Sequence, residues 1–185
     1  IEAFIDAKRD SHVLRRFNLS VLVTDAFMEA VRHDRDWALV FPAEEKTPAD
    51  ADFIQRAWSG RTEPVHCRVH RRVRARELWD RLMRATYEYA EPGVLFIDRI
   101  NQQNNLWYRE QISATNPCGE LPLPPYGACD LGSINLTAFV RDPFTGRARL
   151  DLNEIRKTAA IAVRMMDNTI DASLFPLEKQ AVQAR

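Results

Sequence analysis

The feature that most constrains the fold is an amphipathic stretch followed at once by a short apolar run. Between Ala75 and Ala90, apolar side chains recur at the spacing of one helix face, namely Leu78, Leu82, Ala85 and Tyr89. Pro92-Gly93 ends this pattern, and the run Val94-Leu95-Phe96-Ile97 follows. A run this short suits a strand buried on both faces, as in a parallel sheet covered by helices. The sequence therefore predicts an α/β fold.

Periodicity predicts five more elements, which are strands at 17–23, 37–41 and 65–69 and helices at 26–33 and 153–171. Thr24 or Asp25 is expected to cap the first of these helices, and Asp151 or Asn153 the second. The second helix should bury one stripe of side chains, formed by Ile155, Ala159, Ala162, Met166 and Ile170. The segment 42–63 is interpreted as a surface excursion, so we expect a single domain over residues 1–185.

Composition excludes several classes of protein. The 26 Lys and Arg residues balance 26 Asp and Glu residues, so no net charge draws the chain to nucleic acid or to an anionic membrane. With 45% hydrophobic and 28% charged residues the chain can bury a core, and no apolar run reaches the roughly 18 residues of a membrane span. Three cysteines are too few for a secreted disulfide scaffold, which predicts a cytoplasmic protein. The two ends suggest an internal piece of a longer chain.

The segment 113–130 is too rich in proline and glycine for a regular helix, because proline lacks an N–H and fixes φ. Within it, the thiol of Cys118 has the amide of Asn116 two residues before it and the carboxylate of Glu120 two residues after it. In an extended loop such side chains point the same way, so three reactive groups could meet one small substrate. The structural alternative is a buried Cys118, an exposed Glu120 and an Asn116 that supplies turn geometry.

Other polar motifs carry weaker signals. Cys129 follows Cys118 in the same segment, where the pair could form a disulfide or face a common substrate. The run 66–70 contains two histidines and a cysteine, but strand alternation puts Cys67 on the face opposite His66 and His70. No metal site is therefore predicted. The arginines between 68 and 76 are interpreted as a solvated face.

Together these motifs resemble the catalytic subunit of ribonucleotide reductases, most closely the adenosylcobalamin-dependent class. The resemblance rests on Asn116-Pro117-Cys118-Gly119-Glu120, on the spaced Cys129, and on Asp-Leu-Gly-Ser-Ile-Asn-Leu at 130–136. Flanking stretches agree at 17–21, 24–28, 85–87, 91–101 and 104–105. The resemblance thus spans nearly the whole chain and is weakest over 42–63.

The resemblance implies part of a ten-stranded α/β barrel with a catalytic finger loop, and it assigns roles to several residues. Cys118 would form the thiyl radical that abstracts the ribose 3′-hydrogen, Glu120 would take the 3′-hydroxyl proton, and Asn116 would hydrogen-bond the ribose hydroxyls. The substrate-binding residues would be Asn116, Pro117, Cys118, Gly119 and Glu120. Cys129 matches one member of the cysteine pair that supplies two electrons, and its partner would lie upstream of this chain. Cys67 does not match that partner.

The same resemblance implies adenosylcobalamin as cofactor, a ribonucleotide as substrate, a thioredoxin-like reductant, nucleotide effectors and a homodimeric parent. We expect residues 1–185 to be one partial catalytic barrel domain that is inactive alone. Three alternatives stay open: an iron- or manganese-dependent reductase of the same family, a non-catalytic nucleotide-binding or assembly module, and a thiol oxidoreductase that pairs Cys118 with Cys129. The last is disfavoured because the neighbouring Glu120 carboxylate opposes the thiolate that such chemistry needs.

Overall fold

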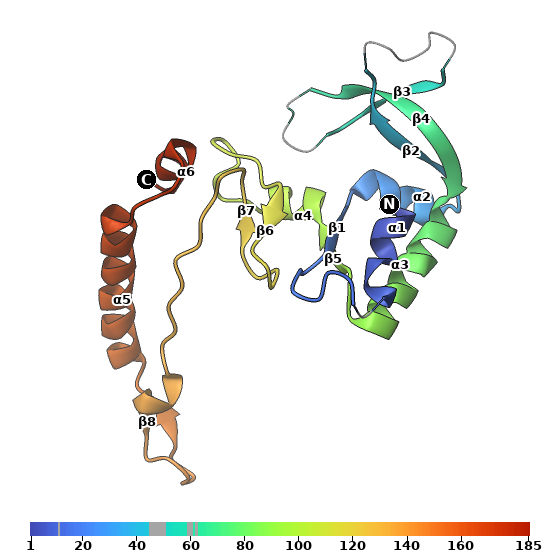
Figure 1. Cartoon of the computed structure of the whole chain (residues 1–185). Helices are drawn as coiled ribbons and strands as arrows, with labels where there is room; N and C mark the ends of the chain where they lie inside the picture. Colours follow the sequence, from blue (N-terminus) through green and yellow to red (C-terminus); the bar gives the residue numbers. More distant parts are fainter. Residues whose placement is uncertain (11, 45–50, 59–60, 62) are drawn as a thin grey trace. The chain divides into compact units, whose positions relative to one another are not determined.

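The structure is a computed structural model that describes residues 1–10, 12–44, 51–58, 61 and 63–185 (Figure 1). The chain forms two compact units, Ile1–Pro125 and Tyr126–Arg185, and each is described by itself. The single domain expected over 1–185 stays a prediction. Among the described residues, no helix combines the length and the apolar character needed to cross a membrane.

The predicted parallel strand pair lies in the first unit. Strand β1 (Ser20–Val23) pairs in parallel with β5 (Gly93–Phe96), so that Ser20 lies opposite Gly93 and Val23 opposite Phe96. The prediction that the 94–97 run is buried on both faces is wrong, since no residue of β5 is fully buried and Phe96 is 44% exposed. The reason is that only β1 pairs with β5 in the described part of the chain. Ile97 begins the short helix α4 (Ile97–Gln102) instead of ending the strand.

The core of the first unit lies where three helices meet beside β1 (Figure 1). The predicted helices are confirmed as α2 (Asp25–Arg32) and α3 (Ala75–Tyr89), and α1 (Glu2–Ile5) also packs on α3. The hydroxyl of Thr24 caps α2 by accepting a hydrogen bond from the Phe27 N–H at 3.2 Å. The buried core side chains are Ile5, Val23, Phe27, Ala30, Val31, Ala75, Leu78, Leu82 and Ala85.

Tyr89 is an exception to the buried stripe that was predicted for α3. Its side chain is 41% exposed, whereas Leu78, Leu82 and Ala85 are buried as expected. Tyr89 is the last residue of the helix, one turn beyond Ala85, and it belongs neither to the buried core nor to the side chains packed against it. A regular apolar spacing therefore predicts which face is buried but not where burial stops.

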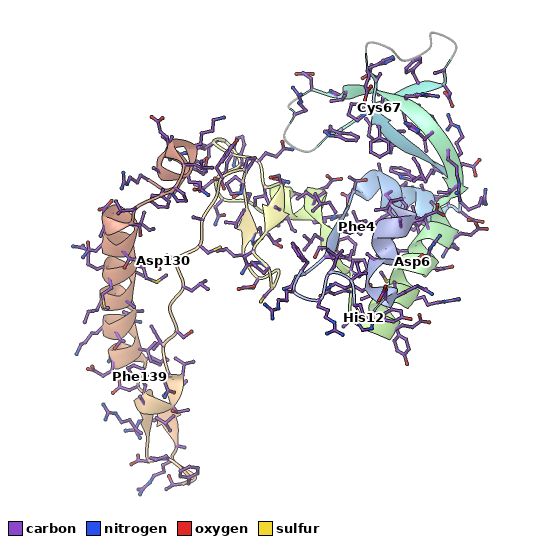
Figure 2. All side chains as sticks on the ribbon, in the orientation of Figure 1. Phe4, Asp6, His12, Cys67, Asp130 and Phe139 are labelled. Carbon is purple, nitrogen blue, oxygen red and sulfur yellow. The ribbon has the colours of Figure 1, made fainter. Side chains whose placement is uncertain are left out.

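The remaining strands of the first unit form an antiparallel sheet in the order β2–β4–β3. Its members are β2 (Asp36–Pro42), β4 (Val65–Arg74) and β3 (Phe53–Arg56). The alternation predicted for β4 is confirmed: Cys67, labelled on the sheet in Figure 2, is fully buried. His66 and His70 are exposed. Of the predicted surface excursion at 42–63, β3 is described, and 45–50, 59, 60 and 62 lie outside the described residues.

The second unit is built around one long helix. It contains the 3₁₀ turn η2 (Leu136–Phe139), the hairpin β8 (Val140–Arg141) and β9 (Arg149–Leu150), then α5 (Leu152–Ala172) and α6 (Glu178–Ala184). Helix α5 confirms the prediction at 153–171, and Asp151 caps it by accepting from the Glu154 N–H at 3.1 Å. The five side chains of its predicted stripe are all partly buried, but no residue of α5 is fully buried.

The α/β class is confirmed, since helices and strands mix throughout the chain. The described strands form one three-stranded and three two-stranded sheets, and none of these closes into a barrel.

Candidate functional site

The candidate residues lie on a small β-hairpin that the sequence pattern did not predict. Strands β6 (Ala114–Thr115) and β7 (Pro122–Leu123) pair antiparallel, and the Asn116 N–H donates to the Leu121 carbonyl at 3.1 Å. Each strand has only two residues, so neither shows a readable alternation. Cys118 lies in the turn between them, and the proline- and glycine-rich segment is therefore ordered at this point.

Asn116 closes the turn from inside. Its side-chain oxygen Oδ1 accepts a hydrogen bond from the Leu121 N–H at 3.0 Å, and its backbone carbonyl accepts from the Gly119 N–H at 3.1 Å. The Thr115 hydroxyl donates to the same carbonyl at 2.9 Å. A side-chain oxygen bonded to nearby backbone is the usual means by which asparagine stabilises turns. The structure thus gives Asn116 the turn role of the structural alternative and leaves its Nδ2 donors without a partner in the described chain.

Gly119 sets the direction of the turn. Its φ of +85° lies in the left-handed region, where a side chain is strained and glycine is not. A Cβ built at this position would meet nothing within 4 Å, so the requirement for glycine comes from backbone conformation and not from space. Residues 117–120 accordingly form a turn and bend, which corrects the expectation of an extended loop with aligned i and i+2 side chains.

The reactive side chains are accessible. Cys118 is a free, exposed thiol and Glu120 is also exposed, with no hydrogen bond or ion pair between them in the described structure. The buried Cys118 of the structural alternative is therefore not observed. Open access to the thiol is compatible with a substrate or a bulky cofactor that approaches from outside the chain.

Cys129 belongs to the second unit, so its placement relative to Cys118 is not described. Its thiol is free and exposed. The next residue, Asp130, lies beside a cleft between the segment 130–139 and helix α5 (Figure 2). Its carboxylate atom Oδ2 is buried without a hydrogen-bond partner in the described structure.

Cys67 differs from the other two cysteines. It is completely buried in the sheet, and burial raises the pKa of its thiol while the Arg56 guanidinium opposes that shift. His66 stacks on Phe53 with ring centroids 4.6 Å apart, so it does not face Cys67. In the ranges that the structure describes, no cluster of His, Cys, Asp and Glu is arranged to hold a metal ion.

The arginines between 68 and 76 are exposed, as the interpretation of a solvated face expects. Several of them also form ion pairs or hydrogen bonds with other residues of the chain. Arg71 pairs with Glu2 at 3.1 Å, and Arg72 pairs with Asp52 at 2.7 Å. Arg74 pairs with Asp34 and Asp36, and Arg76 donates to the Val31 carbonyl at 2.8 Å.

Sequence reasoning missed one residue at the hairpin. The side-chain Nδ2 of Asn18 donates to the carbonyl oxygen of Pro117 at 2.6 Å, although the two residues are 99 positions apart. Asn18 stands within the predicted strand 17–23, where it was treated only as part of a strand. No local spacing connects it to Cys118.

Comparisons with a family model and with curated proteins point to the same family. The model of a family described as "Ribonucleotide reductase, barrel domain" matches residues 1–185. The chain is 35% identical over 179 residues to a vitamin B12-dependent ribonucleoside-diphosphate reductase of Thermoplasma acidophilum. It is 38% identical over 183 residues to a protein of the same name from Mycobacterium tuberculosis, and 25% identical over 188 residues to a ribonucleoside-diphosphate reductase subunit alpha of Chlamydia pneumoniae.

These alignments cover 97%, 98% and 95% of this chain but only 20%, 22% and 18% of the respective relatives. The chain therefore spans about a fifth of the length of the curated relatives that it matches.

Proposed function

Because this chain belongs to the ribonucleotide reductase barrel-domain family, we propose that it forms part of an enzyme that reduces ribonucleotides to 2′-deoxyribonucleotides for DNA synthesis. The observation that carries the proposal is the exposed Cys118 thiol on an ordered turn, with Glu120 on the same turn. A thiol, an acid and an amide on one short hairpin are the groups that this reduction needs. We also propose roles in this reaction for Cys118, Glu120, Asn116 and Cys129.

Cys118 starts the reaction as a sulfur radical. It takes the 3′-hydrogen of the ribose, so an S–H bond forms as the C3′–H bond breaks. Glu120, as general base, removes the proton of the 3′-hydroxyl, and its exposed carboxylate is accessible to a ligand. Asn116 donates from Nδ2 to a ribose hydroxyl, because its Oδ1 already accepts from Leu121. The run 116–120, with Pro117 and Gly119, forms the substrate-binding surface.

Reduction then needs two electrons. The 2′-hydroxyl leaves as water, and a cysteine pair supplies two electrons and two protons and becomes a disulfide. Cys129 is one member of that pair, and its partner is a cysteine of the parent protein outside these residues. Cys118 returns its hydrogen to C3′, which completes the deoxyribose and restores the sulfur radical.

Adenosylcobalamin is the proposed source of that radical, supported by the vitamin B12-dependent relatives at 35% and 38% identity. The residues present fit this group in one respect: the Cys118 thiol is exposed, and a Cβ added at the neighbouring Gly119 would meet no atom within 4 Å beyond its chain neighbours in the described structure. When bound, the cofactor supplies a one-electron oxidation of a thiol. No residue of this chain is assigned to hold it.

Exposure of the hairpin also bears on activity. Radical intermediates need a site that excludes water, and Cys118 and Glu120 are both exposed here. We propose that other parts of the parent enzyme enclose the hairpin and bind the substrate phosphates. The 185 residues alone are then inactive.

The parent enzyme is proposed to act in the cytoplasm as a homodimer. A thioredoxin-like dithiol would reduce its cysteine pair again after each turnover. Nucleotide effectors would regulate it. These partners follow from the family proposal and not from contacts in this chain.

The test uses the full-length parent with a ribonucleoside diphosphate, a dithiol reductant and adenosylcobalamin, and it measures deoxyribonucleotide formation. Replacing Cys118 by Ser should lower turnover by about 1,000-fold or more, as loss of a reacting group typically does. A matched control is Cys67→Ala, which changes a buried thiol outside the hairpin and should retain most of the activity.

Full activity of the Cys118→Ser variant would contradict the proposal and favour a non-catalytic module. If the unsubstituted parent reduces nucleotides only after a second, radical-bearing subunit is added, the iron- or manganese-dependent alternative is correct. The relatives named as alpha subunits are the observation that keeps this alternative open.

A further inference from the structure

One side chain connects the hairpin to the rest of the first unit from a distant point in the sequence. Asn18 precedes β1, and its Nδ2 donates to the Pro117 carbonyl at 2.6 Å. Nothing in the turn itself requires this bond, because Asn116 already closes the turn through its own backbone and side-chain oxygens. The bond therefore adds a long-range contact that fixes where the turn lies and limits how often it opens.

The Pro117 carbonyl is well placed to control Cys118. This carbonyl and the Cys118 N–H belong to one planar peptide unit. Fixing the direction of the oxygen fixes the plane, and with it the position of the Cys118 Cα and the direction from which its thiol extends.

Asn18 is itself held on both sides. The Lys8 ammonium group donates to the carbonyl of Phe17, the residue before Asn18, and pairs with the Glu91 carboxylate at 3.1 Å. The Leu19 N–H, on the other side, donates to the same carboxylate at 3.4 Å. The Lys8 side chain is only 13% exposed, which favours a defined position for these charges.

The strand pair anchors this network. The Leu19 carbonyl accepts from the Gly93 N–H at 2.8 Å, where β1 and β5 begin to pair. A continuous series of hydrogen bonds and covalent neighbours thus runs from the parallel strands through Leu19 and Asn18 to the peptide unit of Cys118.

We propose that Asn18 is a positioning residue: it orients the Pro117–Cys118 peptide unit and thereby aims the Cys118 thiol at the sugar. The expected effect on catalysis rests on the proposed function. The tether, by which we mean the hydrogen bond from Asn18 to the Pro117 carbonyl, does not depend on it. Asn18 is exposed in the described chain, and its bond gains strength when the site is closed to water. A misplacement of about 1 Å at a reacting atom can cost about 100-fold in rate.

The test is Asn18→Asp in the full-length parent. Asp has the shape of Asn but offers only acceptors to the Pro117 carbonyl, so the bond is replaced by a repulsive contact. We expect kcat to fall by about tenfold to 100-fold and KM for the nucleotide to stay within about twofold, because Asn18 does not bind substrate. Asn18→Ala, which removes the donor without repulsion, should show the same split to a smaller degree.

A second measurement is independent of activity. Hydrogen exchange, read by mass spectrometry over residues 113–123, should be faster in Asn18→Asp, because the Gly119 and Leu121 amides bond within the tethered turn. The matched control is Asn153→Asp on the exposed first turn of α5. There the side-chain oxygen accepts from Arg156 at 3.3 Å, and an acid keeps that acceptor.

The outcomes separate the two proposals. Unchanged exchange in both Asn18 variants overturns the tether, and an active parent whose kcat is unchanged by Asn18→Asp overturns the positioning role. An unsubstituted parent that forms no deoxyribonucleotide contradicts the proposed function, while faster exchange in the variants would still support the tether.

Discussion

The two units of the chain differ in how they are held together. In Ile1–Pro125, helices α1, α2 and α3 enclose a core in which Leu82 is 2% exposed and Ala85 is fully buried. In Tyr126–Arg185, no described residue is fully buried, although α5 is the longest helix of the chain with 21 residues. A well-formed helix therefore does not imply a core.

The difference lies in what covers each helix. The apolar face of α3 packs on two other helices, whereas α5 packs on the short segment around η2. Three further apolar residues of α5, Ile161, Val163 and Met165, are 59–64% exposed. A helix that is apolar on more than one face is typical of one covered on several sides. The contacts within the second unit thus leave much of the apolar surface of α5 uncovered.

The largest expected effect sharpens this contrast in the core. Leu82→Ala should lower the free energy of unfolding by about 2–5 kcal/mol, because it leaves a cavity in a closed core. Ile161→Ala on α5 should change it by less than about 0.5 kcal/mol, since its side chain is 63% exposed. Urea unfolding of both variants, followed by circular dichroism, makes the comparison. Equal losses would show that the second unit has a core of its own.

A smaller effect compares the turns of two hairpins, one in each unit. Gly119→Ala should destabilise the β6–β7 turn by about 1 kcal/mol, because alanine is strained at a φ of +85°. Gly146→Ala lies in the β8–β9 turn, where the φ is not in the left-handed region and a Cβ meets nothing within 4 Å. It should be neutral or stabilising by up to about 1 kcal/mol, because alanine restricts the unfolded chain. Thermal unfolding distinguishes them, and the opposite ranking would exclude the assigned turn geometry.

The smallest effect concerns acid. Hydrogen bonding from Arg81 holds the pKa of Asp6 below its ordinary value, and the Glu154 N–H and Arg141 do the same for Asp151. A folded pKa below the unfolded one means that the stabilisation is present above about pH 4 and is lost as the pH falls through the folded value. Loss of the Asp6 contact leaves the closed core of the first unit in place. Loss of the Asp151 cap affects α5, which has no fully buried residue to stabilise it.

Circular dichroism at 222 nm should therefore decline between about pH 4 and pH 2, mainly through α5. Asp151→Asn keeps a good capping group and removes the titration, so its signal should match the original at pH 7 and fall less in acid. Asp6→Asn should leave the acid-induced change nearly as it is. A variant Asp151→Asn that declines as steeply as the original chain would contradict this assignment.

Sequence periodicity predicted the fold where one face of an element is buried. The alternation around Cys67 gave β4, and the spacing of Leu78, Leu82 and Ala85 gave α3, because burial of one face imposes a period of 2 or 3.6. It failed for Phe96, whose exposure depends on how many strands pair beside β5 and not on its neighbours in sequence.

At the candidate site, the sequence could give the residue types but not their arrangement. Asn116, Cys118 and Glu120 were found from their chemistry in one loop. The turn at Gly119 was missed because two-residue strands carry no alternation. Asn18 was missed because its partner lies 99 positions away, and only the folded chain brings them together.

The distribution of the three sulfur atoms has a practical consequence. Cys67 is sealed inside its sheet, whereas Cys118 and Cys129 are open to solvent, one in each unit. Maleimide reagents should therefore label those two positions of the natural sequence and spare the third, because access limits alkylation. Bifunctional maleimide linkers of increasing length can then be tested for cross-linking of Cys118 to Cys129. The shortest linker that joins both thiols gives the distance to which the hairpin and the second unit approach in solution.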